Sequence, residues 1–230
     1  SRKIFSKCSL KKSEQGYWFL NPMPSEKELD KYYNSLYWES RGGKNDIVIA
    51  RDLIHFDILK RYVNEFQENK ILMNFGSGHG GLSHLAWIQG LKIINIEPGG
   101  MSKNYNQRWQ FYKSIDDAPD NSADILYGSH SLEHVQNIDK FLIEAKRVLK
   151  NNGIMFWEVP NAICESNGAM RGIIDIPHTY YYTTKFFENI FSEIILNMAF
   201  DEEEDTKIDE WENYNNPRGS IIRAIGRFNS

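Results

Sequence analysis

The chain has 230 residues, which suits one large domain or one domain with an appendage. Hydrophobic residues make up 41% and charged residues 25%, the composition of an ordinary globular protein. A net charge of −4 and the lack of a basic block argue against a nucleic-acid partner. No apolar run approaches the ~20 residues of a membrane span, so no membrane partner is expected. With only Cys8 and Cys164 present, we expect no disulfide framework and a reducing, cytoplasmic location.

Residues 1–45 read as an N-terminal arm. Pro22 and Pro24 keep part of it extended, because proline disfavours the helical conformation in the residue before it. Ser25 and Glu28 have the spacing of a capping box, which predicts a short helix beginning near Ser25. The aromatic residues that either form a lid over a substrate or pack as an arm against the core are Tyr33, Tyr37 and Trp38.

A long amphipathic helix is predicted over Asp46–Glu68, with Asp46 as its cap. Its apolar side chains recur at a spacing of four, which places them on one stripe: Ile54, Ile58, Tyr62 and Phe66. The stripe predicts that one side of the helix packs against the core. His55, which falls on the same helix, is interpreted as a surface or packing residue.

The stretch Ile71–Gly81, ILMNFGSGHGG, predicts a buried strand that runs into a glycine-rich turn. A helix is expected directly afterwards, over Leu82–Gln89. Gly76, Gly78 and Gly80 allow backbone conformations that other residues avoid, and they let a ligand approach the main chain closely. The N-terminus of the following helix favours polar or anionic groups. The turn is therefore a candidate binding loop.

The next strand, Leu91–Glu97, ends in a carboxylate 21 residues after Gly76. An acid at this place accepts hydrogen bonds from both hydroxyl groups of an adenosine ribose. The loop also fits the pattern G-x-G-x-x-G through Gly76, Gly78 and Gly81, which is typical of dinucleotide sites. Together the two elements indicate a nucleoside-containing cofactor and leave its identity open.

Strands and helices continue to alternate toward the C-terminus. Met101–Tyr112 predicts a helix followed by a short strand. Further strands are predicted over Asp124–Gly128 and Ile154–Val159, with a helix, Asn137–Lys150, between them. Gly153 stands just past that helix, as a helix stop should. This alternation implies parallel β-α units with right-handed crossovers.

Residues 161–183 interrupt the rhythm with glycines and a run of tyrosines. Beyond them, Thr184 is expected to cap a helix over Lys185–Phe191. Ile208–Tyr214 and Ile221–Phe228 read as two strands joined by a turn. We expect these two strands to form the antiparallel pair that closes the sheet.

The segment Ala123–Val135, ADILYGSHSLEHV, resembles the class I S-adenosylmethionine-dependent methyltransferases, in particular the branch with LEHV that is common among sugar and small-molecule methyltransferases. Arg147–Gly153, RVLKNNG, is similar to the RVLKPGG of that family. The resemblance implies an α/β fold: a Rossmann-like, seven-stranded sheet, mostly parallel with a C-terminal antiparallel strand, and a small N-terminal appendage. It also implies an arm or lid at residues 1–45, a methyltransferase domain at 46–230 and, inside it, an acceptor-pocket insertion at 161–183.

Two features depart from the family pattern. Asn74 stands where the family often has an acid, so the family's hydrogen bonds inside the glycine loop are not carried over. The N-terminal leader of related sugar methyltransferases often follows a cysteine-rich zinc motif. Cys8 is alone here, and we expect that metal part to be missing.

The resemblance implies that S-adenosylmethionine is the cofactor. The residues expected to bind it are Gly76, Ser77, Gly78, Gly80, Glu97, Asp116, Ser129 and His130. Asp116 or Asp117 is expected to meet the adenine amino group, and the competing interpretation of this segment is a solvated turn.

A hydroxyl acceptor benefits from a base that removes its proton, and histidine suits that task because its unperturbed pKa is about 6.5. The candidate catalytic residues are His178, beside Tyr180–Tyr182 in the insertion, and His134, in the LEHV segment. Each also has a structural interpretation, as a loop histidine or a neighbour of the cofactor. No metal ligand is assigned. If a divalent metal takes part, its candidate ligands are Glu158 and His178, with His134 and Asp175 beside them.

These observations predict an enzyme, an S-adenosylmethionine-dependent methyltransferase that O-methylates a sugar or nucleotide-linked sugar in surface-polysaccharide biosynthesis. The nearest alternative is C- or N-methylation of another small polar metabolite. Two other classes compete: a NAD-dependent oxidoreductase, from the G-x-G-x-x-G match, and a non-catalytic relic that binds the cofactor. No oligomeric state is predicted.

Overall fold

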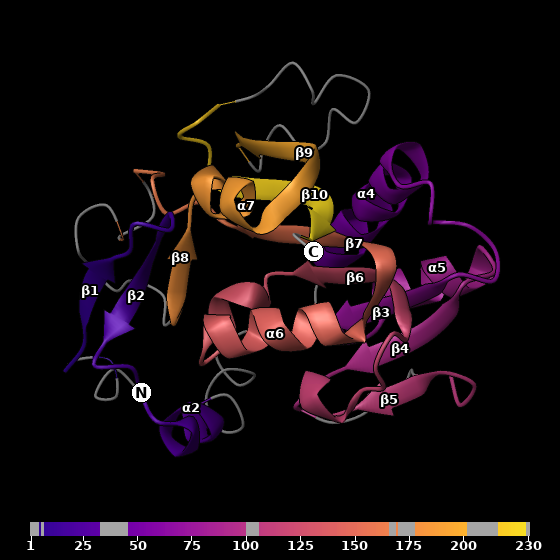
Figure 1. The fold of residues 1–230 in the computed structure, drawn as a ribbon, viewed down its shortest axis with the longest axis horizontal. Helices are drawn as coiled ribbons and strands as arrows, with labels where there is room; N and C mark the ends of the chain where they lie inside the picture. The colour runs from indigo at the N-terminus through magenta and orange to yellow at the C-terminus, as the bar shows by residue number, and fades with distance from the viewer. Residues whose placement is uncertain are drawn as a thin grey trace.

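The computed structural model describes residues 5, 7–32, 46–99, 106–165, 169, 178–201 and 216–228. These residues form a seven-stranded central sheet with helices on both faces, and a smaller three-stranded sheet to one side (Figure 1). Within these ranges, no helix has the length and apolarity needed to cross a bilayer.

The central sheet has the strand order β5-β4-β3-β6-β7-β10-β9. Its first five strands pair in parallel, whereas β10 runs antiparallel between β7 and β9. The strand bounds are β3 (Ile71–Phe75), β4 (Lys92–Ile96), β5 (Gln110–Tyr112), β6 (Ala123–Ser129), β7 (Leu149–Pro160), β9 (Phe191–Phe200) and β10 (Ile221–Phe228). The predicted sheet, mostly parallel with one C-terminal antiparallel strand, is confirmed.

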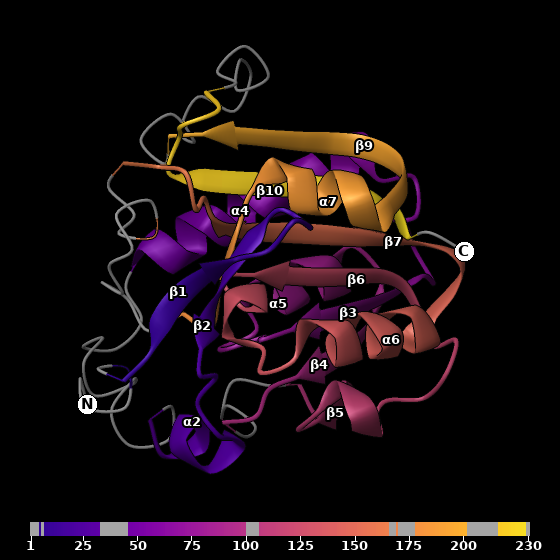
Figure 2. The ribbon, with the colours of Figure 1, turned by 60° about the vertical axis from the view of Figure 1, so that its left-hand side comes forward.

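Helices cover both faces of this sheet. Figure 2 shows α6 and α7 on one face and α4 and α5 on the other. Their bounds are α4 (Asp46–Tyr62), α5 (Gly81–Ile88), α6 (Ile138–Val148) and α7 (Thr184–Ile190). Consecutive strand residues point to opposite faces. Leu72 and Phe156 therefore pack with α4 and α5, while Met73 and Trp157 pack with α6 and α7. Burial on both faces explains why these strands are apolar at successive positions.

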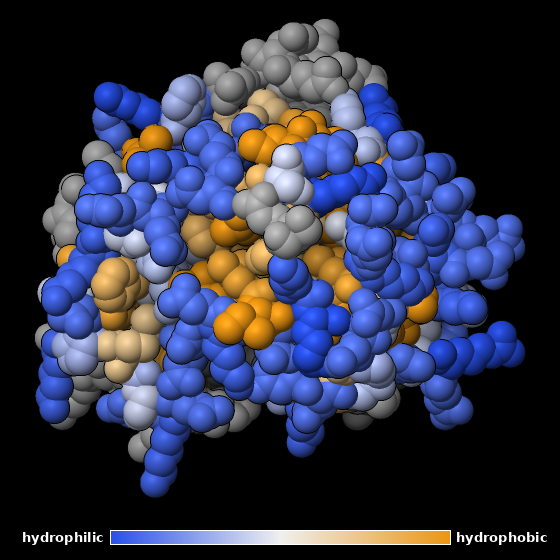
Figure 3. Space-filling model, in the orientation of Figure 1, coloured by the Kyte–Doolittle hydropathy of each residue, from blue (hydrophilic) through white to orange (hydrophobic). Residues whose placement is uncertain are grey.

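The helix α6 shows how the predicted amphipathic pattern is used. Its buried residues are Ile138, Phe141, Ala145 and Val148. Ile143, on its outer side, is 66% exposed. Figure 3 shows apolar residues gathered near the centre of this face of the molecule, with hydrophilic residues around them.

The smaller sheet joins the N-terminal arm to the insertion. β1 (Ser9–Lys12) and β2 (Tyr17–Asn21) form a hairpin, and β2 pairs antiparallel with β8 (Tyr180–Tyr182). Tyr17 stands opposite Tyr182, and its ring lies edge-on to the ring of Tyr180, 5.5 Å away. Two segments far apart in the sequence thus share one sheet.

The short helix α2 (Glu26–Tyr32) begins where the capping box predicts it. The backbone N–H of Ser25 donates to Glu28 Oε2 at 2.9 Å, and the Ser25 hydroxyl donates to the same oxygen at 2.6 Å. The aromatic residues expected to form a lid, Tyr33, Tyr37 and Trp38, lie outside the described residues, as does the helix expected after Met101.

Several helix boundaries differ from the prediction. α6 ends at Val148 rather than at Lys150, so Gly153 lies in β7 and is not the helix stop that the sequence predicted. α4 ends at Tyr62 rather than at Glu68, and a turn follows that still buries Phe66. The apolar residues recur at a spacing of four beyond the end of the helix. The reason is that the turn after the helix buries Phe66 on the same side as the helix residues. α7 begins at Thr184, so Thr183 is the N-cap residue rather than Thr184.

The strand that pairs with β10 differs from the one that the sequence predicted. β10 pairs with β9, residues 191–200, which the sequence did not indicate as a strand. Only the two ends of β9 are buried, and its register with β10 shifts between Ile225 and Gly226. Both features disrupt the alternation that marks a strand. The expected partner, residues 208–214, lies outside the described residues.

Candidate active site

The glycine loop lies between β3 and α5. Gly76, Gly78 and Gly80 have φ angles of +71°, +55° and +75°, in the left-handed region that favours glycine. A Cβ atom on Gly76 would stand 2.5 Å from the Cβ of Ser131. Because Gly80 is also the N-cap residue of α5, the loop runs directly into the N-terminus of that helix. The three glycines thus adopt the backbone conformation that the sequence predicts, and their role in binding a ligand stays a prediction.

Glu97 lies beside this loop, immediately after β4. Its Oε2 accepts a 2.7 Å hydrogen bond from the backbone N–H of Gly78, and its Oε1 accepts one of 3.2 Å from Gly99. The backbone of Gly76 donates to the carbonyl oxygen of Ile96 at 2.9 Å, which fastens the loop to the strand that carries Glu97. A carboxylate against an open glycine cradle fits the ribose of an adenosine-containing cofactor.

Asn74 occupies the buried place behind the loop. Its Nδ2 donates to Ser83 Oγ at 2.9 Å, and that hydroxyl donates to Asn95 Oδ1 at 2.6 Å. The three neutral side chains tie α5 to β3 and β4 without burying a charge. The departure from an acid at position 74 therefore has a local role in holding the loop's supports together.

Two further predicted cofactor residues, Asp116 and Ser129, have other partners in the structure. Asp116 lies in a short 3-10 helix, η2 (Ile115–Asp117), where its exposed carboxylate forms an ion pair with Lys140. Ser129, the last residue of β6, donates its hydroxyl to Glu158 Oε1 at 3.3 Å. Their roles toward a cofactor stay predictions.

His130 follows β6 with a φ of +48° and lies between two carboxylates. Its Nδ1 is 3.5 Å from Glu133 Oε1, and its Nε2 is 3.6 Å from Glu158 Oε1. Burial alone would lower the pKa of this imidazole, but the two carboxylates outweigh it and raise the pKa to about 9. His130 is therefore a cation at neutral pH.

The LEHV segment forms a second 3-10 helix, η3 (Leu132–His134), that brings three further groups together. The rings of His134 and His178 lie 4.9 Å apart, and donor atoms of both lie within 4.8 Å of each other and of a Glu133 oxygen. Glu133 is only 1% exposed. Burial would raise its pKa, but His130 and the charge of the neighbouring histidines outweigh burial and lower the pKa to about 2.

The structure thus places the two predicted catalytic histidines side by side, with a buried carboxylate that sequence reasoning missed. Asp175, expected near them, lies outside the described residues. A signal for Glu133 was present: it stands three residues after one histidine and directly before another, in a segment taken only as a family signature.

Glu158, which lies on the other side of His130 from Glu133, belongs to a buried network on the α4 side of the sheet. Its Oε2 accepts hydrogen bonds from Arg223 Nε at 3.1 Å and from His55 Nε2 at 2.7 Å, and Arg51 Nε lies 3.4 Å from Oε1. The other nitrogen of His55 lies 2.6 Å from the Tyr127 hydroxyl. Burial would raise the pKa of Glu158, but His55 and Arg223 outweigh it and hold the pKa well below its ordinary value.

This network bears on the predictions for His55 and for Glu158. His55 is fully buried and bonded on both ring nitrogens, so it is neither a surface residue nor simple packing. The carboxylate of Glu158, a conditional metal ligand, is already held by Arg223 and His55. An arginine in the apolar run of β10 signals a buried ion pair, although the sequence does not say with which carboxylate.

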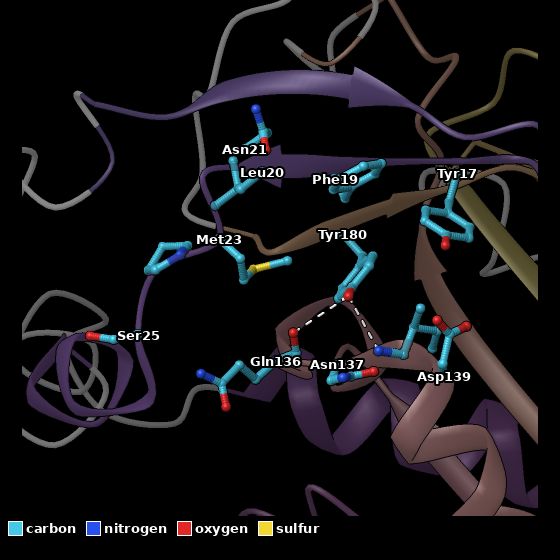
Figure 4. A pocket seen from close by; sticks show the side chains of 12 residues that line it. Tyr17, Phe19, Leu20, Asn21, Met23, Ser25, Gln136, Asn137, Asp139 and Tyr180 are labelled. Carbon is cyan, nitrogen blue, oxygen red and sulfur yellow. Dashed lines mark hydrogen bonds between the residues drawn. The ribbon is translucent and has the colours of Figure 1, made fainter.

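A pocket of about 670 Å³ opens between β2 and the start of α6 (Figure 4). Residues of β2, namely Tyr17, Phe19 and Asn21, line one side together with Tyr180, and Gln136 and Asp139 at the start of α6 line the other. The Tyr180 hydroxyl accepts a hydrogen bond from the backbone N–H of Ile138 at 3.2 Å and donates to the carbonyl oxygen of Gln136 at 3.4 Å.

A family model described as "Methyltransferase domain" matches residues 30–219. A SAM-dependent methyltransferase structure from Archaeoglobus fulgidus is 21% identical, with a TM-score of 0.53, over 85% of this chain and 99% of that one. One from Mesorhizobium loti is 13% identical, with a TM-score of 0.53, over 76% and 97%. The cyclase SpnF is 15% identical, with a TM-score of 0.58, over 77% and 81%.

At these identities the structural likeness shows the fold alone, whereas the family match covers most of the chain. No match among curated proteins was found. The family match decides against the NAD-dependent oxidoreductase and the non-catalytic relic. The chain belongs to the methyltransferase domain family and is an S-adenosylmethionine-dependent methyltransferase.

Proposed function

We propose that this enzyme works in the cytoplasm and methylates a hydroxyl oxygen of a sugar or nucleotide-linked sugar used in surface-polysaccharide biosynthesis. The observation that carries the proposal is the pocket between the N-terminal arm and the methyltransferase sheet. Its volume, about 670 Å³, lies within the range of ~300–1,000 Å³ that is usual for small-molecule sites.

The lining of this pocket suits a hydroxyl-rich ring. The rings of Tyr17, Phe19 and Tyr180 offer apolar surfaces for the C–H faces of a sugar, and Asn21, Gln136 and Asp139 offer donors and acceptors for its hydroxyl groups. Three aromatic rings and three polar side chains converge from segments far apart in the sequence. Such a site favours a ring that carries hydroxyl groups around its edge and C–H groups on its faces.

The chemistry required of the protein is modest. The bound cofactor supplies a methyl group already activated on a sulfonium. The chain's residues must hold the acceptor in line, exclude water and take up or release a proton. His178 lies two residues before Tyr180, so their Cα atoms are at most about 7 Å apart. His178 is thus close along the chain to a residue that lines the pocket, and its ring lies 4.9 Å from the ring of His134, between centroids.

The test is to incubate the chain with S-adenosylmethionine and a panel of nucleotide sugars, free sugars, phenols and small amines, and to measure S-adenosylhomocysteine by mass spectrometry. We expect methylation of a sugar hydroxyl. Phe19→Ala and Asp139→Asn should raise the KM for that acceptor about tenfold, or about 1.4 kcal/mol, without changing cofactor affinity. Lys11→Ala, on an exposed position of β1, is the control. Turnover of phenols alone would contradict the proposal.

One observation favours a second candidate, N-methylation of a small amine. The carboxylate of Asp139 lies in the pocket lining and would attract an ammonium group. Methylation of amines but not of sugars in the same panel, abolished by Asp139→Asn, would support this candidate over the first.

A further inference from the structure

We propose that Glu133, His134 and His178 together bind one divalent transition-metal ion, such as Zn²⁺ or Mn²⁺, with coordination positions left open for hydroxyl oxygens of the acceptor. That the open positions hold an acceptor hydroxyl rests on the proposed function. The binding of the ion itself does not.

The first support is the geometry of the donor atoms. One ligand atom from each of the three side chains lies within 4.8 Å of the other two. Donors on a tetrahedral ion at ~2.1 Å are about 3.4 Å apart. Movements of the order of 1 Å, within reach of side-chain rotation, close that difference. Two imidazoles and a carboxylate are the ligand types that such an ion prefers.

The second support is the state of Glu133. It is 1% exposed, and neither of its carboxylate oxygens accepts a hydrogen bond from any residue that the structure describes; the imidazole of His130 lies 3.5 Å from Oε1. A buried carboxylate without hydrogen bonds is costly and rare in folded proteins. An ion among the three side chains would satisfy this charge directly.

The third support is that the backbone holds the cluster in place. The N–H and the hydroxyl of Thr179 both donate to the carbonyl oxygen of Glu133, at 2.9 and 2.8 Å, and the hydroxyl lies 2.6 Å from the carbonyl oxygen of Val135. Tyr182 donates its hydroxyl to the carbonyl oxygen of Leu132 at 3.1 Å. These bonds fix His178, in the insertion, against the turn that carries the other two side chains.

Three protein ligands with open positions are typical of catalytic rather than structural metal sites. A hydroxyl oxygen bound to such an ion has a lowered pKa. Its O–H bond breaks, the proton passes to solvent water, and the electron pair stays on the oxygen, where the ion stabilises the charge. In this arrangement His134 and His178 act as ligands, and no histidine base is required.

The test measures metal binding by the whole chain without cofactor or acceptor. After chelation and removal of the chelator, Zn²⁺ and Mn²⁺ are titrated by calorimetry, and Co²⁺ is followed by its visible absorption. We expect one ion per chain and a raised melting temperature. His134→Ala and His178→Ala should each weaken binding at least tenfold. His84→Ala, which removes an exposed histidine of α5, should leave binding unchanged.

A third variant guards against misfolding. Glu133→Gln keeps the shape of the side chain and removes its charge, and it should weaken metal binding while S-adenosylmethionine still binds. The proposal is overturned if the unmodified chain binds none of the three ions saturably, or if both histidine variants bind them as tightly as the original chain. A failed acceptor panel with intact metal binding would count against the proposed function alone.

Discussion

At the scale of single residues, the predicted cofactor site depends on the contact between Glu97 and the glycine loop. The Glu97 carboxylate accepts hydrogen bonds from the backbone of Gly78 and Gly99, so it is oriented before any ligand arrives. A side chain placed in advance loses less conformational freedom on binding. This is a physical reason for a carboxylate at the end of β4.

Replacing this carboxylate should weaken the binding of the cofactor. We expect Glu97→Ala to lower the affinity for S-adenosylmethionine about 10- to 100-fold, because hydrogen bonds to a charged group contribute ~1.5–3 kcal/mol. Titration calorimetry measures the change. Glu97→Gln, which still offers an acceptor to the loop, separates loss of the charge from loss of loop support. Glu188→Ala, an exposed acid on α7, is the control. Unchanged affinity in Glu97→Ala would contradict the assignment of Glu97 to the ribose.

At the scale of elements, β7, β10 and α4 meet around one buried charge. Arg223 of β10 stands opposite Glu158 of β7 in the strand register, and both side chains are fully buried. His55 reaches the same carboxylate from α4. The guanidinium of Arg223 also lies over the ring of Phe200, 4.6 Å from its centroid. A long helix and the C-terminal strand are thereby held to the centre of the sheet.

Removing one member of this buried network should be costly. We expect Arg223→Met to lower the free energy of unfolding by about 3–5 kcal/mol, because the buried carboxylate of Glu158 loses the guanidinium that pairs with it. Urea denaturation measures the loss. Arg218→Met is the matched control, since Arg218 pairs with Glu165 at an exposed site and should cost at most about 1 kcal/mol. Adding Glu158→Gln to Arg223→Met should recover part of the loss. Equal effects of the two arginine replacements would show that burial does not matter here.

At the scale of the whole molecule, the N-terminal arm and the insertion after β7 act as one unit. Tyr17 of β2 contacts Tyr180 and Tyr182 of β8 and, at 5.7 Å between ring centroids, Phe186 of α7. The arm therefore supplies one wall of the pocket that we propose for the acceptor, while the central sheet carries the glycine loop that we propose for the cofactor. A division of the chain at residue 45 stays a prediction.

Removing the ring of Tyr17 should weaken the binding of the acceptor and leave the binding of S-adenosylmethionine unchanged. We expect Tyr17→Ala to raise the KM for the acceptor and to speed hydrogen exchange of the β1 and β2 amides, because large-to-small changes at buried aromatic sites cost about 3–5 kcal/mol. The affinity for S-adenosylmethionine should hold, since the glycine loop lies elsewhere in the fold. Lys11→Ala in the same hairpin is the control. Protected β1 and β2 amides in Tyr17→Ala would contradict the role given to the ring.

The central fold was predictable because its signals are local. A run such as ILMNF followed by glycines forces a buried strand and a tight turn, and the apolar spacing within α6 leaves it one side to bury. The place of β9 was not predictable, because its partly exposed surface and shifted register remove the alternation on which strand prediction depends.

The sequence by itself determined the parallel part of the sheet, the glycine loop followed by Glu97 and the family, since each depends on residues close together in the chain. Only the tertiary structure decided which distant side chains meet. It paired Arg223 and His55 with Glu158, placed β2 beside β8 to form a pocket, and brought His178 to Glu133 and His134. The physical reason is that charges and rings far apart in the chain meet through tertiary packing. Such pairs have no fixed separation in the sequence, so no sequence pattern identifies them.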